Sequence, residues 1–201
     1  MPVKITEKFE EAVSYIIRLQ GHQYRKGTKI PYISHLLATA ATVMEYGDSE
    51  EQVIAALLHD AAEDAGGEAT LIEIESKFGT EVAGIVKACS DTLEENKPEW
   101  KTRKKAYIEK LKQVNNHSVL LVSIADKLHN IQSILRDYKK TGEKLWERFN
   151  ASRDETLCYY YSLLDIYKNR SKHLNSVLIN ELEANLEEIS QLITKNNATV
   201  N

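Results

Sequence analysis

The chain has 201 residues, of which 42% are hydrophobic and 28% are charged, a balance that supports a folded core beneath a charged surface. Its formal net charge of −4 argues against a nucleic-acid partner, because domains that bind nucleic acid normally carry a basic excess. No segment reaches the roughly 18 consecutive apolar residues of a membrane span, and no apolar leader follows the N-terminus. Two distant cysteines, Cys89 and Cys158, are expected to be buried free thiols, as in a reducing cytoplasm. We therefore predict a cytoplasmic protein, and the lack of an apolar span predicts no membrane partner.

Apolar residues recur at helical spacing along most of the chain, and no run alternates strictly enough to predict a strand. The third predicted helix begins after a capping box at 48–51, carries a long apolar run and ends at Gly66. The other predicted helices, in chain order, span roughly residues 6–20, 31–46, 70–78, 80–89, 100–113, 118–138, 144–168 and 176–194. We therefore predict an all-α fold.

The predicted helices favour one domain over residues 1–170, followed by a C-terminal helical extension over residues 171–201. An apolar stripe along this extension includes Leu178, Leu182 and Leu186, and it suits packing on the bundle or on a partner helix. Association of two copies as a homodimer is compatible with this stripe and stays open.

The segment that follows the apolar run Val53–Leu58 is the most informative of the chain. It places His59, Asp60, Glu63 and Asp64 within six residues. If the helix continues through them, His59 and Glu63 share one face, and the two aspartates share the neighbouring one. Three carboxylates crowded beside an imidazole at the end of a buried helix repel one another unless a cation lies among them. We interpret this segment as part of a metal site.

Two further polar residues in apolar surroundings could complete such a site. His35 lies between Ile33-Ser34 and two leucines, and Asp126 follows a run of seven mostly apolar residues. Taken singly, the histidine could be a core residue and the aspartate could cap a helix or pair with a neighbouring basic side chain. Together with His59 and Asp60 they make a mixed imidazole and carboxylate set, which suits Mn²⁺, Fe²⁺, Co²⁺ or Zn²⁺ better than Ca²⁺.

Five short motifs occur in the order typical of one hydrolase family. They are Tyr24–Thr28, Pro31–His35, Ala55–Asp60, Glu63–Asp64 and Ala125–Asn130. Over roughly residues 5–170 the chain resembles the hydrolase domain of RelA/SpoT-type proteins, including their stand-alone small forms, within the HD-domain superfamily of metal-dependent phosphohydrolases. The resemblance implies an HD-domain helical bundle and Mn²⁺-dependent removal of pyrophosphate from the 3′ position of (p)ppGpp.

The resemblance also implies roles for individual residues. The metal ligands would be His35, His59, Asp60 and Asp126. Glu63 and Asp64 match an acidic pair that activates or orients the attacking water and manages its protons.

Four other residues match substrate contacts of the family. Arg25 and Lys26 match a basic pair near the nucleotide, where they can neutralise phosphate charge. Asn130 matches a substrate-contacting asparagine, and Ser133 stands where a threonine is usual. The implied partner is therefore a small-molecule nucleotide.

Some alternatives remain open at this point. The chain departs from the family pattern at Leu36 and Lys127, which stand where a proline and an arginine are usual. An HD-type hydrolase of another nucleoside mono- or triphosphate, or a metal-holding nucleotide sensor without turnover, would share the same motifs. The basic side chains between Lys97 and Lys105 could either contact phosphate or form a solvated helix face.

Overall fold

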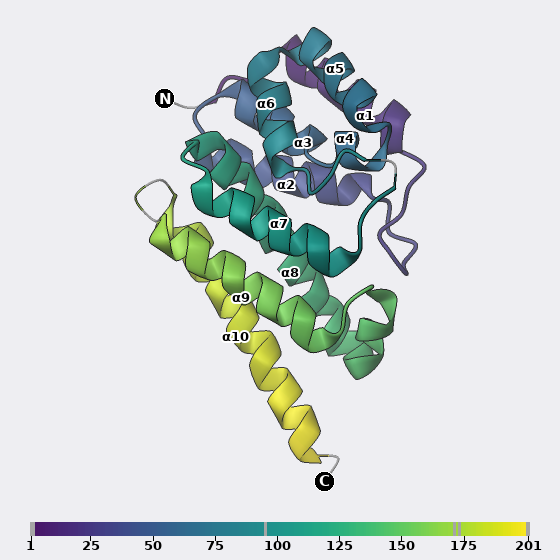
Figure 1. Cartoon of the computed structure of the whole chain (residues 1–201), viewed down its shortest axis with the longest axis vertical. Helices are drawn as coiled ribbons and strands as arrows, with labels where there is room; N and C mark the ends of the chain where they lie inside the picture. Colours follow the sequence, from purple (N-terminus) through teal and green to yellow (C-terminus); the bar gives the residue numbers. More distant parts are fainter. Residues whose placement is uncertain (1–2, 95, 171, 173, 200–201) are drawn as a thin grey trace. The chain divides into compact units, whose positions relative to one another are not determined.

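The computed structural model of the chain describes residues 3–94, 96–170, 172 and 174–199 (Figure 1). Apart from an isolated β-bridge between Tyr24 and Pro31, the regular structure of these residues is helical and contains no strand. The predicted all-α fold is confirmed. Among the helices described, none is both long enough and apolar enough to cross a bilayer. The expected cytoplasmic location and the expected lack of a nucleic-acid partner stay predictions.

The chain divides into two compact units, residues 1–126 and residues 127–201. The first contains α1 (Glu7–Gln20), α2 (Ile33–Tyr46), α3 (Glu50–Leu58), α4 (Ala61–Asp64), α5 (Gly67–Phe78), α6 (Thr80–Cys89), α7 (Trp100–Gln113) and the first part of α8 (His117–Thr141). The second contains the rest of α8, the 3₁₀ helix η1 (Gly142–Arg148), α9 (Arg153–Asn169) and α10 (Ser176–Thr199).

Helix α3 is the most deeply buried element of the first unit. The side chain of Ser49 caps its start by accepting a hydrogen bond from the main-chain N–H of Gln52 at 3.3 Å. The apolar run from Val53 to Leu58 is 0% exposed at every position, because α1, α2 and α6 all pack against this helix. Burying each large side chain of the run contributes about 1.5–3 kcal/mol, so the end of α3 is firmly fixed.

The prediction that the third helix continues through residues 59–64 is wrong. Helix α3 ends at Leu58, His59 and Asp60 form a turn, and α4 begins at Ala61. The ring of His59 donates from Nδ1 to the carbonyl of Ala56 at 2.8 Å, the carbonyl that a continuing helix would pair with the N–H of Asp60. Asp60 accordingly adopts φ −95° and ψ −5°, near the bridge region rather than the helical minimum.

Two other helix boundaries differ from the prediction. Helix α5 begins at Gly67, three residues earlier than predicted, so Thr70 lies inside it and its hydroxyl donates to the carbonyl of Ala65. The predicted helix 144–168 is divided into η1 and α9, because a full capping box between Ser152 and Glu155 starts α9 at Arg153, nine residues later than 144.

In the second unit, α10 runs beside α9 (Figure 1). The predicted apolar stripe is buried there, with Leu178, Leu182 and Leu186 each at most 1% exposed. The division into a domain of residues 1–170 and an extension of residues 171–201, and the formation of a homodimer, stay predictions. Cys158 of α9 is exposed and Cys89 of α6 is half-buried, so the expected burial is wrong for Cys158.

Candidate metal centre

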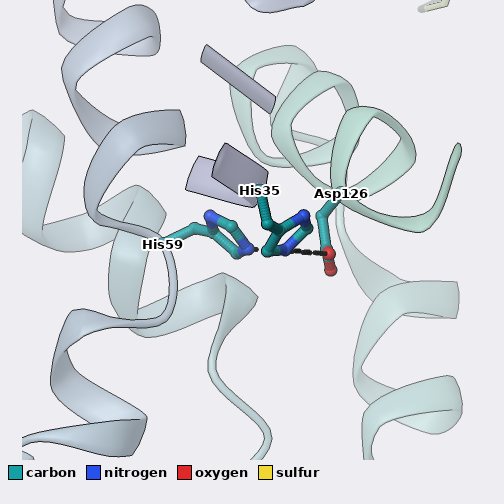
Figure 2. A group of neighbouring side chains, drawn as sticks. All are labelled: His35, His59 and Asp126. Carbon is teal, nitrogen blue, oxygen red and sulfur yellow. Dashed lines mark ion pairs between the residues drawn. The ribbon is translucent and has the colours of Figure 1, made fainter. Parts of the chain in front are cut away.

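Three side chains from separate elements of the first unit meet at one point. His35 comes from the first turn of α2, His59 from the turn after α3, and Asp126 from α8, and Figure 2 shows them pointing toward one another. Their candidate ligand atoms all lie within 4.8 Å of one another, and all three residues are buried. Nε2 of His35 lies 3.2 Å from Oδ1 of Asp126, and Nε2 of His59 lies 3.6 Å from the same oxygen. The predicted clustering of these residues is therefore present.

Asp60 adds a second carboxylate to this cluster. Its Oδ2 lies 3.1 Å from Nε2 of His59 and 3.7 Å from Nε2 of His35. The same oxygen accepts a hydrogen bond from the hydroxyl of Tyr32. Two imidazole nitrogens and two carboxylates converging in a largely buried space are a donor set that fits a divalent cation of the Mn²⁺ to Zn²⁺ series.

The charges of the cluster also fit a cation. Burial alone would lower the pKa of His59, but the carboxylates of Asp60 and Asp126 outweigh it and raise that pKa well above its usual value. Burial opposes ionisation of Asp60, yet the neighbouring His59 holds the pKa of Asp60 well below its usual range. A proton and a divalent cation would therefore compete for the His59 imidazole.

The acidic pair of α4, Glu63 and Asp64, forms ion pairs with basic side chains. Glu63 Oε2 accepts a hydrogen bond from the main-chain N–H of Asp91 at 2.8 Å, and its Oε1 lies 3.3 Å from both Lys97 Nζ and an Arg103 guanidinium nitrogen. Asp64 Oδ1 lies 2.9 Å from Lys97 Nζ. Burial and the Asp91 charge raise the pKa of Glu63, and burial and the Asp60 charge raise the pKa of Asp64.

The basic residues therefore have a role that neither sequence alternative described. Lys97 and Arg103 form ion pairs with Glu63, and Arg103 and Lys104 form ion pairs with Asp91, while contact of these residues with phosphate stays a prediction. These contacts join the segment after α6 and the start of α7 to α4.

Tyr32 and Asp91 were not predicted as site residues. Tyr32 lies within the Pro31–His35 motif, three residues before His35, and this position was the signal available for it. Asp91 follows Ser90 in a polar stretch of sequence. Both residues form a hydrogen bond with a partner 28 residues away in the chain, and local periodicity does not reveal such a partner.

The loop that carries Arg25 and Lys26 is a short hairpin. The N–H of Arg25 donates to the carbonyl of Ile30 at 2.8 Å, and the N–H of Tyr32 donates to the carbonyl of Gln23 at 2.9 Å. The guanidinium carbon of Arg25 lies 5.7 Å from the centre of the Tyr32 ring, within range of a cation–π contact. Arg25 is thus held beside the tyrosine that bonds to Asp60, whereas the role of both basic residues as substrate contacts stays a prediction.

Asn130 and Ser133 belong to the second unit, in the later part of α8. The hydroxyl of Ser133 donates to the carbonyl of His129 at 2.9 Å and accepts from Arg136 at 2.9 Å. Their predicted contacts with substrate stay predictions.

The chain is similar to known proteins over most of its length. A family model described as HD domain matches residues 12–157. Over 121 residues the chain is 36% identical to guanosine-3′,5′-bis(diphosphate) 3′-pyrophosphohydrolase MESH1 of Danio rerio, which covers 59% of this chain and 63% of the relative. Over 130 residues it is 32% identical to the guanosine-3′,5′-bis(diphosphate) 3′-pyrophosphohydrolase of Aquifex aeolicus, which covers 64% of this chain and 18% of the relative. The chain spans less than two thirds of the length of both relatives.

A solved structure of a metazoan orthologue of SpoT, a protein said to hydrolyse ppGpp, is similar to this chain with a TM-score of 0.73. The two chains are 24% identical, and the match covers 92% of this chain and 97% of the other. At this identity the likeness concerns the fold, and it agrees with the helical arrangement described above.

Proposed function

Because the chain belongs to the HD-domain family, whose model spans residues 12–157, we propose that it is a metal-dependent phosphohydrolase that removes pyrophosphate from the 3′ position of (p)ppGpp. The observation that carries the hydrolase assignment is the buried cluster of two imidazoles and two carboxylates, with an acidic pair on the next helix. The substrate is proposed from the names of the relatives and from the Arg25–Lys26 loop beside this cluster.

The ligands that we propose for the metal are His35, His59, Asp60 and Asp126, with Mn²⁺ as the resident ion. The choice of Mn²⁺ rests on the family resemblance, because the mixed nitrogen and oxygen donors suit Mn²⁺, Fe²⁺, Co²⁺ and Zn²⁺ alike. A divalent cation here supplies a Lewis acid that polarises phosphoryl oxygens and lowers the pKa of water.

Glu63 is the group that we propose takes the proton of the attacking water. Its raised pKa brings it closer to neutrality, where a carboxylate is a more effective base, and its two oxygens are oriented by Asp91 and Arg103. Water attacks the phosphorus bonded to the 3′ oxygen, its proton passes to Glu63, and the bond from phosphorus to the 3′ oxygen breaks. The 3′ oxygen takes up a proton, so that ppGpp and water yield GDP and pyrophosphate.

The remaining proposed residues handle charge around the substrate. Arg25 and Lys26 neutralise phosphate oxygens, while Asp64 shares Lys97 with Glu63 and so supports the orientation of the acidic pair. Asn130 and Ser133 are proposed as further substrate contacts on the grounds of the family resemblance alone.

Turnover of a nucleotide panel by metal-stripped protein, with and without added Mn²⁺, tests this proposal. The panel contains ppGpp, pppGpp, GTP, GDP and a deoxynucleoside monophosphate, and the products are separated by anion exchange. We expect Mn²⁺-dependent release of GDP and pyrophosphate from ppGpp, and none from an Asp60→Ala variant that controls for contaminating phosphatase. If phosphate or pyrophosphate were released only from a different nucleotide, (p)ppGpp would be rejected as the substrate and the hydrolase assignment would stand. Folded, metal-loaded protein that turns over no nucleotide would reject the enzyme and favour a sensor.

A further inference from the structure

Glu63 shares one guanidinium with a second carboxylate. The same Arg103 nitrogen lies 3.3 Å from Glu63 Oε1 and 3.1 Å from Asp91 Oδ2. The Asp91 side chain is only 4% exposed, so this shared contact lies in a largely dry environment where charges interact strongly. The position of the Arg103 guanidinium therefore depends on both carboxylates.

Asp91 is itself held from several sides. Lys104 Nζ forms an ion pair with its Oδ2, and the ammonium of Lys110 donates to the neighbouring Ser90 carbonyl at 2.7 Å. Its own main-chain N–H donates to Glu63 Oε2 at 2.8 Å. The corner after α6 is thus fixed by side chains of α7, and one residue of that corner contacts both oxygens of Glu63, directly or through Arg103.

This sharing has a chemical consequence for a general base. An arginine committed to one carboxylate lowers the pKa of that carboxylate by about 1–3 units and occupies the lone pairs that would accept a proton. Asp91 draws the same guanidinium away from Glu63 and adds a negative charge near it, and both effects favour proton uptake by Glu63.

We propose that Asp91 is a positioning residue that divides Arg103 between two carboxylates and so keeps Glu63 able to accept a proton. The base role of Glu63 rests on the proposed function, whereas the effect of Asp91 on Glu63 does not. The charged groups that face Glu63 are Asp60, Asp64, Asp91, Lys97 and Arg103. Loss of the Asp91 charge would leave Glu63 with fewer negative neighbours and the same two cations, Lys97 and Arg103.

Two neighbouring substitutions should move the proton affinity of Glu63 in opposite directions. Asp91→Asn keeps the main-chain N–H, removes the competing charge and leaves Arg103 to Glu63, so we expect the pKa of Glu63 to fall by about one unit. Arg103→Gln removes the cation, so we expect the pKa of Glu63 to rise. Damage to the fold alone would not produce shifts of opposite sign.

The measurement is an NMR titration of the Glu63 carboxyl carbon, with Glu63→Gln used to assign its signal. Asp48→Asn, a substitution of the same type in the loop before α3, serves as the matched control and should leave the titration unchanged. Fold is checked by circular dichroism. If Asp91→Asn does not fold, Arg103→Gln still decides, because an unchanged or lowered Glu63 pKa in that variant overturns the proposal.

Activity gives a second readout. The acid limb of kcat/KM should move to lower pH in Asp91→Asn and to higher pH in Arg103→Gln. Parallel shifts of both variants in the titration, or no shift in either, would overturn the role of Asp91. An absence of nucleotide turnover in the unaltered protein would instead reject the proposed function, and the titration would still test the contact between Asp91, Arg103 and Glu63.

Discussion

The hydroxyl of Tyr32 should control how tightly the metal is held, and Tyr32→Phe isolates that hydroxyl. Burial and the Asp60 carboxylate raise the pKa of Tyr32 well above its usual value, so the hydroxyl keeps the proton that it donates to Asp60. The substitution retains the ring, which lies edge-on to His35 at 5.5 Å and beneath the Arg25 guanidinium at 5.7 Å. The change therefore removes one hydrogen bond and little packing.

The expected magnitude follows from the charge of the acceptor. A hydrogen bond to an ionised group contributes about 1.5–3 kcal/mol, and about 1.4 kcal/mol corresponds to a factor of ten in binding. If most of this energy orients Asp60 toward the ion, the affinity for Mn²⁺ falls by about 10–100-fold, the range typical of groups that support a metal ligand.

Calorimetric titration of metal-stripped protein with Mn²⁺, in competition with a chelator of known affinity, measures this effect. Tyr24→Phe is the matched control, because Tyr24 lies in the same hairpin but is 62% exposed. Its Mn²⁺ affinity should equal that of the unaltered protein. A folded Tyr32→Phe protein that binds Mn²⁺ within threefold of the unaltered protein, or more tightly, would refute the reasoning.

Three further results are expected. Mn²⁺ at 100 times its Kd should stabilise the fold by about 2.7 kcal/mol and raise Tm by about 5–11 °C in a thermal melt, and Asp126→Asn should lose this increment. The Mn²⁺ increment in Tm should be larger at pH 8 than at pH 6. Because the folded-state pKa of His59 is raised, protonation of His59 stabilises the metal-free fold fully below the unfolded histidine pKa of about 6.5. This stabilisation is lost as pH rises through the folded-state pKa. A proton then competes less with the ion for His59, so Mn²⁺ adds more stability at the higher pH. Leu57→Ala, at a side chain that is 0% exposed, should cost about 2–5 kcal/mol in urea unfolding.

Each of these expectations has a contrary outcome. A full Mn²⁺ increment in Asp126→Asn would remove Asp126 from the ligand set. A larger increment at pH 6 than at pH 8 would mean that no proton is displaced from His59. Leu37→Ala, at a side chain that is 44% exposed, should change the unfolding free energy by less than about 0.5 kcal/mol, and an equal cost at both leucines would contradict the central place of α3.

The sequence was most informative where a polar side chain interrupts an apolar run. His35 and Asp126 could be predicted as partners of His59 and Asp60 because an isolated charge in such a run is costly, and burial of both residues agrees with that argument. The break in the helix at His59 could not be predicted in this way. It depends on a bond from the imidazole to the Ala56 carbonyl, and helical periodicity does not distinguish a residue that continues a helix from one whose side chain ends it.

Contacts between distant polar residues were also beyond prediction. Tyr32, Asp91 and Arg103 are residue types common on protein surfaces, and their partners are set by how α2, α4 and α7 approach one another. The roles of Asn130 and Ser133 rest on motif matching, because the spacing of two polar residues along α8 specifies a helix and not a ligand.

The burial of α3 on every side has a consequence for the lifetime of the site. Amide protons of a helix enclosed by α1, α2 and α6 can exchange with solvent deuterium only when those neighbours separate, so those of Val53–Leu58 should be among the slowest in the chain. The Ala56 carbonyl that fixes His59 belongs to this same segment. The orientation of that imidazole should then persist until the first unit opens cooperatively, so the chain keeps a prearranged site between successive encounters with metal or substrate.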